Sequence, residues 1–549
     1  MRSFLRAICM SAALAAIVYG LTVGSDWSDR RWLEALGVSG VLLLLAWWPA
    51  GTRHYSIFNR STLRLATILL VSFALISVQL VRVQIVQSSR TLDRQEIAPN
   101  GQVVQNPRER LLENTENRGS ILDRDGVVLA EQLSEGEGTY RAYPAPAAYG
   151  LVGYYSPLLY GSTGLEAAYD EELSGRAGGN PVTEWLDDVL SREREGYDLH
   201  LTVDLELQQL AADMLGERQG AAILLDAETG ALLAIAGSPN YDPTRLYTDG
   251  DSTEQRLAEV SAYWQEIVGR DDAPLIFRPA DGLYVPGSTF KMLTASALLD
   301  AGLSTPETLY RDEGILEVDG RVIIEQNRPD ETRVDWTLEE SFAYSLNVVF
   351  ASIGLELGAD LLMEYAGRFG FGEPPPLDIG ATASRLTGPE SRLVDSRTLV
   401  ADTAFGQGEL LVTPLQMALI GAAIANDGEI MEPHVVETVV NAEGEVIEET
   451  SPERWLNPIS AETADEMQRL MIASATYGYA SGAPIEGLTV GGKTGTAETG
   501  AGEPHAWFVG YATDGDRTLV AAVIVEHGGA GSVAALPIGR ELLAAAFAS

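Results

Sequence analysis

The chain has 549 residues, of which 46% are hydrophobic, and a formal net charge of −41 at pH 7. This length allows two or three domains beside any membrane part, and the acidity argues against nucleic acid or an anionic lipid surface as the main partner. Cys9 is the only cysteine, so neither an intrachain disulfide nor a cysteine-based metal site is possible. The five histidines are scattered without an H-E-x-x-H pattern, so no zinc site is expected.

Three apolar runs open the sequence, over residues 7–24, 32–50 and 65–81. Each has about the 17–25 residues that a helix needs to cross a bilayer. For the first run a cleaved signal peptide is the alternative, since it is basic and then apolar. Arg2 and Arg6 precede the first run, and Arg53, Arg60 and Arg64 lie between the second and the third, whereas the loop between the first two runs is balanced, with Asp26 and Asp29 against Arg30 and Arg31. By the positive-inside rule this distribution places the N-terminus in the cytoplasm and everything after residue 81 outside.

From residue 90 to residue 236 the pattern predicts a linker and then mostly short β elements. The expected segments are a polar linker over 90–117, a β-hairpin over 118–130 with its turn at Asp125-Gly126, a strand over 200–204, a helix over 205–215 and two strands within 221–236. A glycine-rich break over 175–179 follows the hairpin region, and a second region begins near Asp198.

The rest of the chain alternates predicted helices with three late strands. The expected helices cover 253–267, 288–300, 337–344, the segment after 347, a segment that begins at Pro414 with Thr413 as its cap, and one from about 538; the expected strands are 488–498, 505–512 and 517–526. Strands at both ends of this region, with a helical block between them, indicate one sheet with helices packed on it. The fold class is therefore α/β or α+β.

Ser288 and Lys291 stand three residues apart at the start of a predicted helix. Residues at this spacing are neighbours on one helix face, about 5 Å apart. A serine hydroxyl is a weak nucleophile and needs an adjacent base, which a neutral lysine can provide. The free N–H groups at a helix start also suit a developing oxyanion. Taken alone, however, S-x-x-K is more typical of a capped helix start with a surface lysine.

The distribution of lysines gives this pair more weight. Of 37 basic residues only two, Lys291 and Lys493, are lysines, and the others are arginines. Arginine does not deprotonate near neutral pH, whereas a desolvated lysine can. The two lysines are therefore candidates for positions where amine chemistry matters.

Three motifs follow one another in the chain: Ser288-x-x-Lys291, Ser345-x-Asn347 and Lys493-Thr494-Gly495. Such a set marks penicillin-binding proteins and serine β-lactamases. With the flanking segments 284–291, 406–408 and 413–416, it closely resembles the transpeptidase domain of class B penicillin-binding proteins, most of all the actinobacterial-type members. The resemblance covers roughly residues 106–549.

This resemblance implies a penicillin-binding/serine β-lactamase-like domain, with a central antiparallel sheet flanked by helices, over residues 198–549. A small, non-catalytic, β-rich pedestal would occupy 91–197, and a membrane anchor with three transmembrane helices would occupy 1–90. Two features depart from the family pattern. The anchor has three predicted spans where one is usual, and Phe-Arg-Pro at 277–279 replaces Asn-Arg-Ala.

The resemblance also implies roles for the motif residues. Ser288 would attack the carbonyl carbon of a D-Ala-D-Ala stem terminus to form an acyl-enzyme, and Lys291, kept neutral by a nearby charge, would take the hydroxyl proton. Ser345 would relay the proton to the leaving D-alanine, while Asn347 would hold Lys291 and the substrate amide. The implied substrate-binding residues are Lys493, Thr494, Gly495 and Thr496. The N–H groups of Ser288 and Thr496 would form the oxyanion hole, and no cofactor or metal is implied.

The predicted function is that of a DD-transpeptidase of the plasma membrane, with its catalytic domain outside the cell. It would cross-link peptidoglycan stem peptides of a lipid-linked precursor and bind β-lactams covalently as inhibitors. The resemblance also implies a SEDS-type glycosyltransferase partner in the membrane. The alternative is a membrane-bound β-lactam sensor, although the predicted cytoplasmic loop has no zinc-protease motif of the kind such sensors carry. Roles in elongation, division and sporulation all remain open.

Overall fold

The computed structural model describes residues 2–22, 29–48, 56–82, 96–97, 103–104, 117–135, 138–177, 195–248, 252–500 and 502–548. By its contacts the chain forms two compact units. One comprises residues 1–114 with 178–193, and the other comprises 115–177 with 194–549. Arg53, most of the predicted linker, and the ends of the first two apolar runs lie outside the described residues.

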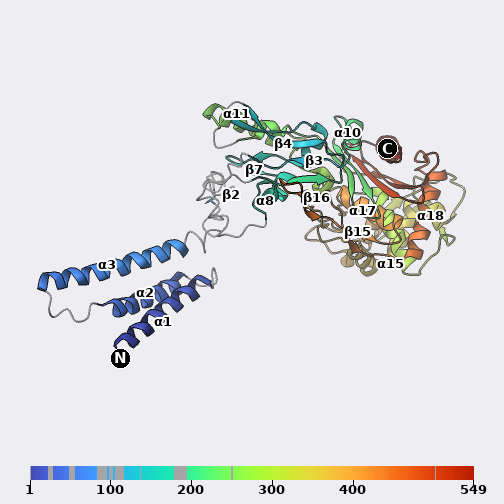
Figure 1. Cartoon of the computed structure of the whole chain (residues 1–549). Coiled ribbons are helices and arrows are strands. Elements are labelled where there is room, and N and C mark those ends of the chain that lie inside the picture. Colours follow the sequence, from blue (N-terminus) through green and yellow to red (C-terminus); the bar gives the residue numbers. More distant parts are fainter. Residues whose placement is uncertain are drawn as a thin grey trace. The chain divides into compact units, whose positions relative to one another are not determined.

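The first unit contains three helices where the three apolar runs were predicted: α1 (Arg2–Thr22), α2 (Asp29–Trp47) and α3 (Ile57–Val81) (Figure 1). α3 begins earlier than its apolar run because the Ser56 side chain caps it, accepting a hydrogen bond from the Asn59 N–H. Within the described residues, Ile57–Leu80 of α3 is long and apolar enough to cross a membrane, whereas the apolar parts of α1 and α2 are shorter. The three-span anchor therefore stays a prediction.

A five-stranded antiparallel sheet, in the order β10-β9-β21-β20-β19, forms the centre of the second unit. Its strands are β9 (Gly220–Asp226), β10 (Leu232–Ser238), β19 (Thr489–Ala497), β20 (His505–Thr513) and β21 (Thr518–Val525). All five were predicted from the sequence. β19, which carries the K-T-G motif, lies at one edge of the sheet.

Helices cover both faces of this sheet, as the side chains of β21 show. Val520, Ala522 and Ile524 belong to the core that includes α17 (Pro414–Ala425), whereas the residues between them pack with α10 (Leu205–Leu215) and α20 (Leu536–Ala546). Successive side chains of a strand point to opposite faces, so a strand covered on both sides reads as a continuous apolar run. The predicted layered α/β architecture is confirmed.

The other helices of the second unit surround this core. They are α6 (Tyr149–Val152), α7 (Leu165–Ala168), α8 (Asp170–Leu173), α11 (Glu254–Val268), α12 (Arg278–Asp281), α13 (Lys291–Asp300), α14 (Leu338–Ala343), α15 (Asn347–Arg368), α16 (Arg397–Ala404), α18 (Ala461–Tyr477) and α19 (Gly531–Ala534). The start of α14 is fixed by a capping box between Thr337 and Glu340. Of these helices, α11, α13, α14 and α15 were predicted from the sequence, and the others were not.

A second sheet, of order β17-β16-β8-β3-β4-β5, spans the predicted boundary between residues 197 and 198. Its strands are β3 (Ile121–Leu122), β4 (Val128–Glu135), β5 (Gly138–Ala142), β8 (Asp198–Leu201), β16 (Val436–Val440) and β17 (Val446–Glu449). β3 and β4 form the predicted hairpin, with Gly126 in its turn at φ +82°. The shorter strands are β1 (Glu96–Ile97), β2 (Val103–Val104), β6 (Tyr155–Ser156), β7 (Gly161–Ser162), β11 (Leu309–Arg311), β12 (Ile315–Val318), β13 (Arg321–Ile324), β14 (Asp335–Thr337), β15 (Ile430–Met431) and β18 (Arg454–Leu456).

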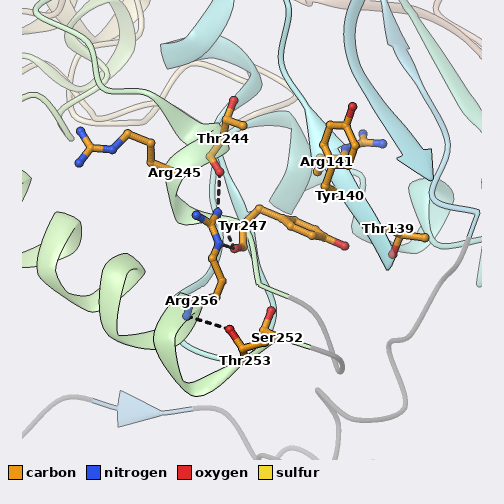
Figure 2. A pocket seen from close by; sticks show the side chains of 9 residues that line it. All are labelled: Thr139, Tyr140, Arg141, Thr244, Arg245, Tyr247, Ser252, Thr253 and Arg256. Carbon is orange, nitrogen blue, oxygen red and sulfur yellow. Dashed lines mark hydrogen bonds between the residues drawn. The ribbon is translucent and has the colours of Figure 1, made fainter. Parts of the chain in front are cut away.

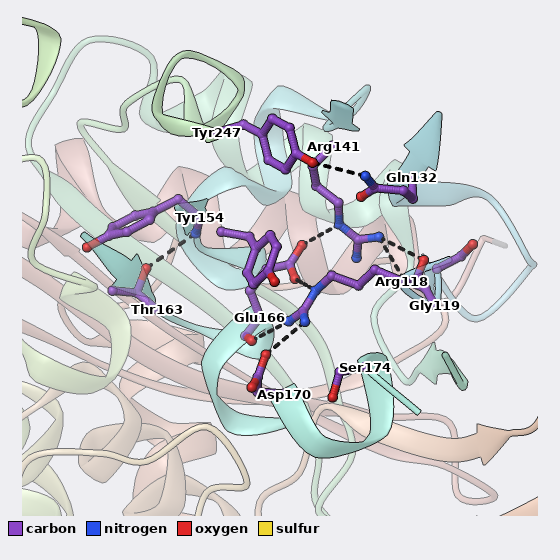
Figure 3. Close-up of polar contacts among 12 residues, drawn as sticks. Arg118, Gly119, Gln132, Arg141, Tyr154, Thr163, Glu166, Asp170, Ser174 and Tyr247 are labelled. Carbon is purple, nitrogen blue, oxygen red and sulfur yellow. Dashed lines mark hydrogen bonds and ion pairs between the residues drawn. The ribbon is translucent and has the colours of Figure 1, made fainter. Parts of the chain in front are cut away.

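A buried ionic cluster holds the segments near this hairpin together (Figure 3). Glu166 accepts hydrogen bonds from Arg118 Nε and Arg141 Nε, each at 2.7 Å, and all three side chains are inaccessible to solvent. Tyr143 also donates to Glu166, and Asp170 binds Arg118 Nη1 at 2.8 Å. Burial alone raises the pKa of Glu166, but the two guanidinium groups outweigh it and hold that pKa below its usual value. The cluster is structural, since each charge is paired.

Candidate active site

The three sequence motifs meet at one open pocket of about 610 Å³. Ser288, Ser345, Asn347, Thr494 and Thr496 all line it, although long stretches of chain separate them. The other lining residues are Arg321, Val322, Ile323, Ile324, Gln326, Asn327, Phe405, Gln407, Tyr479, Glu498, Pro504, Ala530 and Ser532. The three motifs that were recognised in the sequence therefore belong to one site, and it is the fold that brings them together.

Ser288 sits in a tight turn that two backbone contacts fix. The Gly287 N–H donates to Gly406 O at 2.9 Å, and Gly287 has φ +56°. A Cβ on Gly287 would lie 2.9 Å from Thr496 O, and a Cβ on Gly406 would lie 1.7 Å from Gly287 O. The turn, the Gly406–Gly408 segment and the K-T-G strand thus approach backbone to backbone, which only glycine allows at these two positions.

The predicted helix over 288–300 is wrong in its first turn. Residues Gly287–Phe290 form a 3-10 turn, and the α-helix α13 begins at Lys291. The Lys291 N–H donates to the carbonyl oxygen of Ser288, three residues earlier, which is the tighter 3-10 pattern. The serine consequently lies just before the helix, half-buried at the pocket wall.

Both lysines are fully buried and converge on Ser345. Lys291 Nζ donates to Ser345 Oγ at 3.1 Å, to Ser345 O at 2.8 Å and to Asn347 Oδ1 at 2.7 Å. Lys493 Nζ donates to the same Ser345 Oγ at 2.9 Å and to Thr494 O at 3.0 Å. The Ser345 hydroxyl therefore connects the two amines.

Burial and mutual repulsion keep these amines from both being charged. Burial lowers the pKa of Lys291 to about 7, although the Glu325 carboxylate acts in the opposite direction. Burial, and then the charge on Lys291, lower the pKa of Lys493 well below its usual value. Near neutral pH the pair thus has an amine free to accept a proton, which is the property that a general base requires.

Ser345 adopts a backbone conformation that is rare for a serine, with φ +58°. Its carbonyl oxygen accepts hydrogen bonds from Lys291 Nζ and from Asn327 Nδ2 at 2.9 Å, and its N–H donates to Phe342 O at 3.1 Å. A left-handed non-glycine residue costs roughly 1–3 kcal/mol and persists only where its surroundings fix it. The hydrogen bonds of the Ser345 carbonyl oxygen and N–H fix this conformation here.

Thr494, Gly495 and Thr496 lie on the edge strand β19, beside the Ser288 turn. A Cβ on Gly495 would come within 2.9 Å of Pro286 O, and Trp507 of the neighbouring strand donates to Val285 O at 2.9 Å. Thr496 is exposed, whereas Thr494 is buried. An edge strand presents unpaired backbone groups, so this edge can pair with an extended peptide.

Strand β13 and the residues Gln326 and Asn327 after it form a wall of the pocket. Neither this wall, nor the β12–β13 hairpin, nor Glu325 was predicted from the sequence. A signal was present, since Asp319-Gly320 stands between two apolar runs, as is typical of a hairpin turn. Both residues have positive φ, 50° and 88°. Glu325 and Asn327 themselves carry no local pattern that marks them.

A separate hollow of about 360 Å³ contains none of the motif residues (Figure 2). Figure 2 shows the Arg256 guanidinium donating to backbone oxygens of Thr244 and Tyr247. Arg245 stacks on Tyr263 instead, with its guanidinium carbon 3.6 Å from the ring centre. These arginines support the local chain, so the reactive groups belong to the first pocket.

Known proteins resemble this chain along most of its length. Residues 220–544 match the family model "Penicillin binding protein transpeptidase domain", and residues 118–199 match "Penicillin binding protein A dimerisation domain". The peptidoglycan D,D-transpeptidase PbpA of Mycolicibacterium smegmatis is 35% identical over 464 residues, which are 80% of this chain and 91% of that protein.

Solved structures are also similar to this chain. The ceftriaxone acyl-enzyme complex of penicillin-binding protein A from Mycobacterium tuberculosis has a TM-score of 0.71 and 30% identity, covering 79% of this chain and 99% of that one. A D,D-transpeptidase domain from Eggerthella lenta has a TM-score of 0.68 and 32% identity, with 79% and 99% coverage.

The chain therefore belongs to the penicillin-binding protein transpeptidase family, and within it to the class B, actinobacterial type. The predicted family and fold class are confirmed. The predicted function as a transpeptidase that binds penicillin agrees with these relatives, and they do not favour the β-lactam sensor.

Proposed function

We propose that the protein is a membrane-anchored D,D-transpeptidase that cross-links peptidoglycan stem peptides through an acyl-enzyme on Ser288. The observation that carries the proposal is the convergence of two buried lysines on Ser345, in the pocket that Ser288 lines. The acyl-enzyme structures of the mycobacterial relative with ceftriaxone and penicillin G support it.

In the first half-reaction Ser288 Oγ attacks the carbonyl carbon of the penultimate D-alanine, and its proton passes to neutral Lys291. The oxyanion is stabilised by the N–H groups of Ser288 and Thr496. The C–N bond then breaks, and the proton moves through Ser345 Oγ to the leaving D-alanine amine. Asn347 Oδ1, 2.7 Å from Lys291 Nζ, holds the base in place during these transfers.

In the second half-reaction the amine of another stem peptide attacks the ester carbonyl. It gives its proton to Lys291, and the Ser288 oxygen is released and reprotonated. An amide replaces the ester, so the cross-link forms without any external energy source.

Lys493 has a different task from Lys291. The terminal carboxylate of the substrate binds next to Lys493, Thr494 and Thr496 on β19, with Gly495 allowing the close approach of that strand to the Ser288 turn. A negative charge beside Lys493 favours the shared proton on that amine, which leaves Lys291 neutral as the base. Substrate binding thereby prepares the base.

The proposal extends to the anchor. All three helices α1, α2 and α3 cross the plasma membrane, the N-terminus lies in the cytoplasm, and the region after residue 81 lies outside, divided into a pedestal over 91–197 and a transpeptidase domain over 198–549. A SEDS-type glycosyltransferase contacts the anchor and supplies the nascent glycan strand. The apolar character of α3 and the arginines that flank the helices support this arrangement.

An exchange assay tests the activity and distinguishes an enzyme from a sensor. The full-length protein in detergent is given a stem pentapeptide that ends in D-Ala-D-Ala, together with labelled D-alanine. A transpeptidase incorporates the label with turnover, and Ser288→Ala does not. A protein that is acylated by penicillin but never exchanges D-alanine, even on glycan strands with native stem peptides, would overturn the proposal in favour of a receptor.

A further inference from the structure

Glu325 is an unusual residue for this protein. The chain carries 78 acidic residues, yet in the part that the structure describes only Asp123, Glu166, Asp312 and Glu325 are buried among them. Glu325 follows the last residue of β13, and its N–H donates to Gly314 O at 2.9 Å, which fixes its backbone. Its side chain points inward, behind the pocket wall that Gln326 and Asn327 form.

The carboxylate joins two segments that carry site residues. Glu325 Oε1 accepts hydrogen bonds from the N–H groups of Gln326 at 3.0 Å and Asn327 at 2.9 Å, and Oε2 accepts one from the Val348 N–H at 2.9 Å. The buried Glu325 carboxylate thus accepts three hydrogen bonds from backbone N–H groups, which compensate for its loss of contact with water.

The contact with Val348 acts at the start of α15. Leu346, the residue at the N-cap position, has no side-chain oxygen with which to cap the helix. Glu325 supplies that acceptor from a segment 23 residues earlier in the chain, and its negative charge suits the positive end of the helix. Asn347, the first residue of α15, is thereby fixed in the orientation in which its Oδ1 meets Lys291.

The contact with Asn327 acts on Ser345. With its backbone held by Glu325, Asn327 donates from Nδ2 to Ser345 O at 2.9 Å. This is the carbonyl oxygen that also accepts from Lys291, in the residue with φ +58°. Glu325 therefore supports both Ser345 and Asn347 without touching the pocket's reactive atoms.

We propose that Glu325 is a positioning residue of this site, whose carboxylate fixes the Ser345–Asn347 turn and supplies a negative charge that acts on the buried amine of Lys291. The inference rests on the proposed function, since it assigns Glu325 an effect on the base Lys291. The Glu325 carboxylate raises the pKa of Lys291, and the charge on Lys291 in turn lowers the pKa of Lys493.

The direction of the electrostatic effect follows from these charges. Glu325 raises the pKa of Lys291 against the larger, lowering effect of burial. Removing the carboxylate charge lowers that pKa further, so Lys291 becomes neutral at lower pH. The acidic limb of the acylation rate should then move to lower pH, although the base is weaker and the turn less well held.

The experiment measures the second-order rate constant for acylation of the full-length protein by penicillin G between pH 5 and pH 9. For Glu325→Gln we expect slower acylation at pH 8 and an acidic limb shifted to lower pH. If the pKa falls by one unit, the ratio of variant to wild-type rate is about fivefold higher at pH 6 than at pH 8. Glu317→Gln, an identical charge change at an exposed position of the preceding hairpin, should change neither rate nor profile.

Asn327→Ala separates the two roles. It removes the hydrogen bond to Ser345 without changing charge, so it should slow acylation while the pH profile stays where it is. If Glu325→Gln folds poorly, Glu325→Asp retains the charge, and its profile should follow that of the wild type at a lower rate.

The outcomes are distinguishable. A wild-type protein that penicillin does not acylate contradicts the proposed function itself. In another outcome the wild-type protein is acylated, and the pH profile of the Glu325→Gln acylation rate, scaled to the same maximum, coincides with the wild-type profile. That result contradicts only the role of Glu325 in the protonation of Lys291. An unchanged rate in both Glu325→Gln and Asn327→Ala contradicts the positioning role.

Discussion

Lys291 and Lys493 show how one residue type can serve two purposes in one site. Both are buried, and both donate to Ser345 Oγ, yet their other partners differ. Lys291 also donates to Asn347 Oδ1 and Ser345 O, whereas Lys493 donates to Thr494 O on the edge strand on which a substrate would lie. The proposed roles, base and carboxylate-binding cation, follow from this difference.

Substituting each lysine with arginine separates these roles. Arginine keeps its proton at any accessible pH, so Lys291→Arg should lower the rate of penicillin acylation by about 100-fold or more. Arginine can still supply charge and donors, so Lys493→Arg should lower the rate by a smaller factor, mostly through weaker binding.

The measurement is the acylation rate constant of each variant, with circular dichroism as the control for folding. Equal rates for the two variants would show that Lys291 is not the base. Ser288 would then require another activating group.

The site also depends on the contact between the Ser288 turn and the Gly406–Gly408 segment. Gly406 has φ +88°, and its Cβ would lie 1.7 Å from Gly287 O. We expect Gly406→Ala to push the Ser288 turn away from β19 and to reduce acylation at least about tenfold, together with a loss of stability.

Gly444 provides the matched control, because its φ of +82° is similar and nothing lies within 4 Å of its Cβ position. Gly444→Ala should cost roughly 1–2 kcal/mol of stability, from backbone strain alone, and leave acylation unchanged. The readouts are the melting temperature and the acylation rate. A Gly406→Ala variant that acylates like Gly444→Ala would mean that this contact does not position the serine.

The elements also show what could be predicted from sequence. Local signals predicted α17, where Thr413 caps the helix and Pro414 is its first residue, and β21, in which every residue after Thr518 is apolar. α16 lacks a comparable apolar stripe. The pairing of β16 with β8 joins residues more than 230 positions apart, and no local pattern contains that register.

Some residues of the site could likewise be predicted from the sequence, and others could not. Ser288, Lys291, Ser345, Asn347 and the K-T-G residues were recognisable because their types and spacing form a pattern. Only the folded structure shows that the two lysines converge on the Ser345 hydroxyl. Glu325 and Asn327 act through backbone N–H groups and a carbonyl oxygen, which leave no signature in a single sequence.

In the proposed arrangement, the anchor places the catalytic region outside the cytoplasm. The three-span arrangement predicts that a reporter active only outside the cytoplasm works when fused within residues 24–29 or after Arg90, and is silent when fused near Tyr55. This follows from the arginines between α2 and α3. Reporter activity at Tyr55 would reject three spans.

The residue to which penicillin becomes attached identifies the nucleophile. The full-length protein is treated with penicillin G, digested, and the modified peptide is sequenced by mass spectrometry. We predict one penicilloyl adduct, on the Ser288 side chain, which is absent from Ser288→Ala while the fold persists. An adduct on any other residue, or one that remains in Ser288→Ala, would show that Ser288 is not the nucleophile.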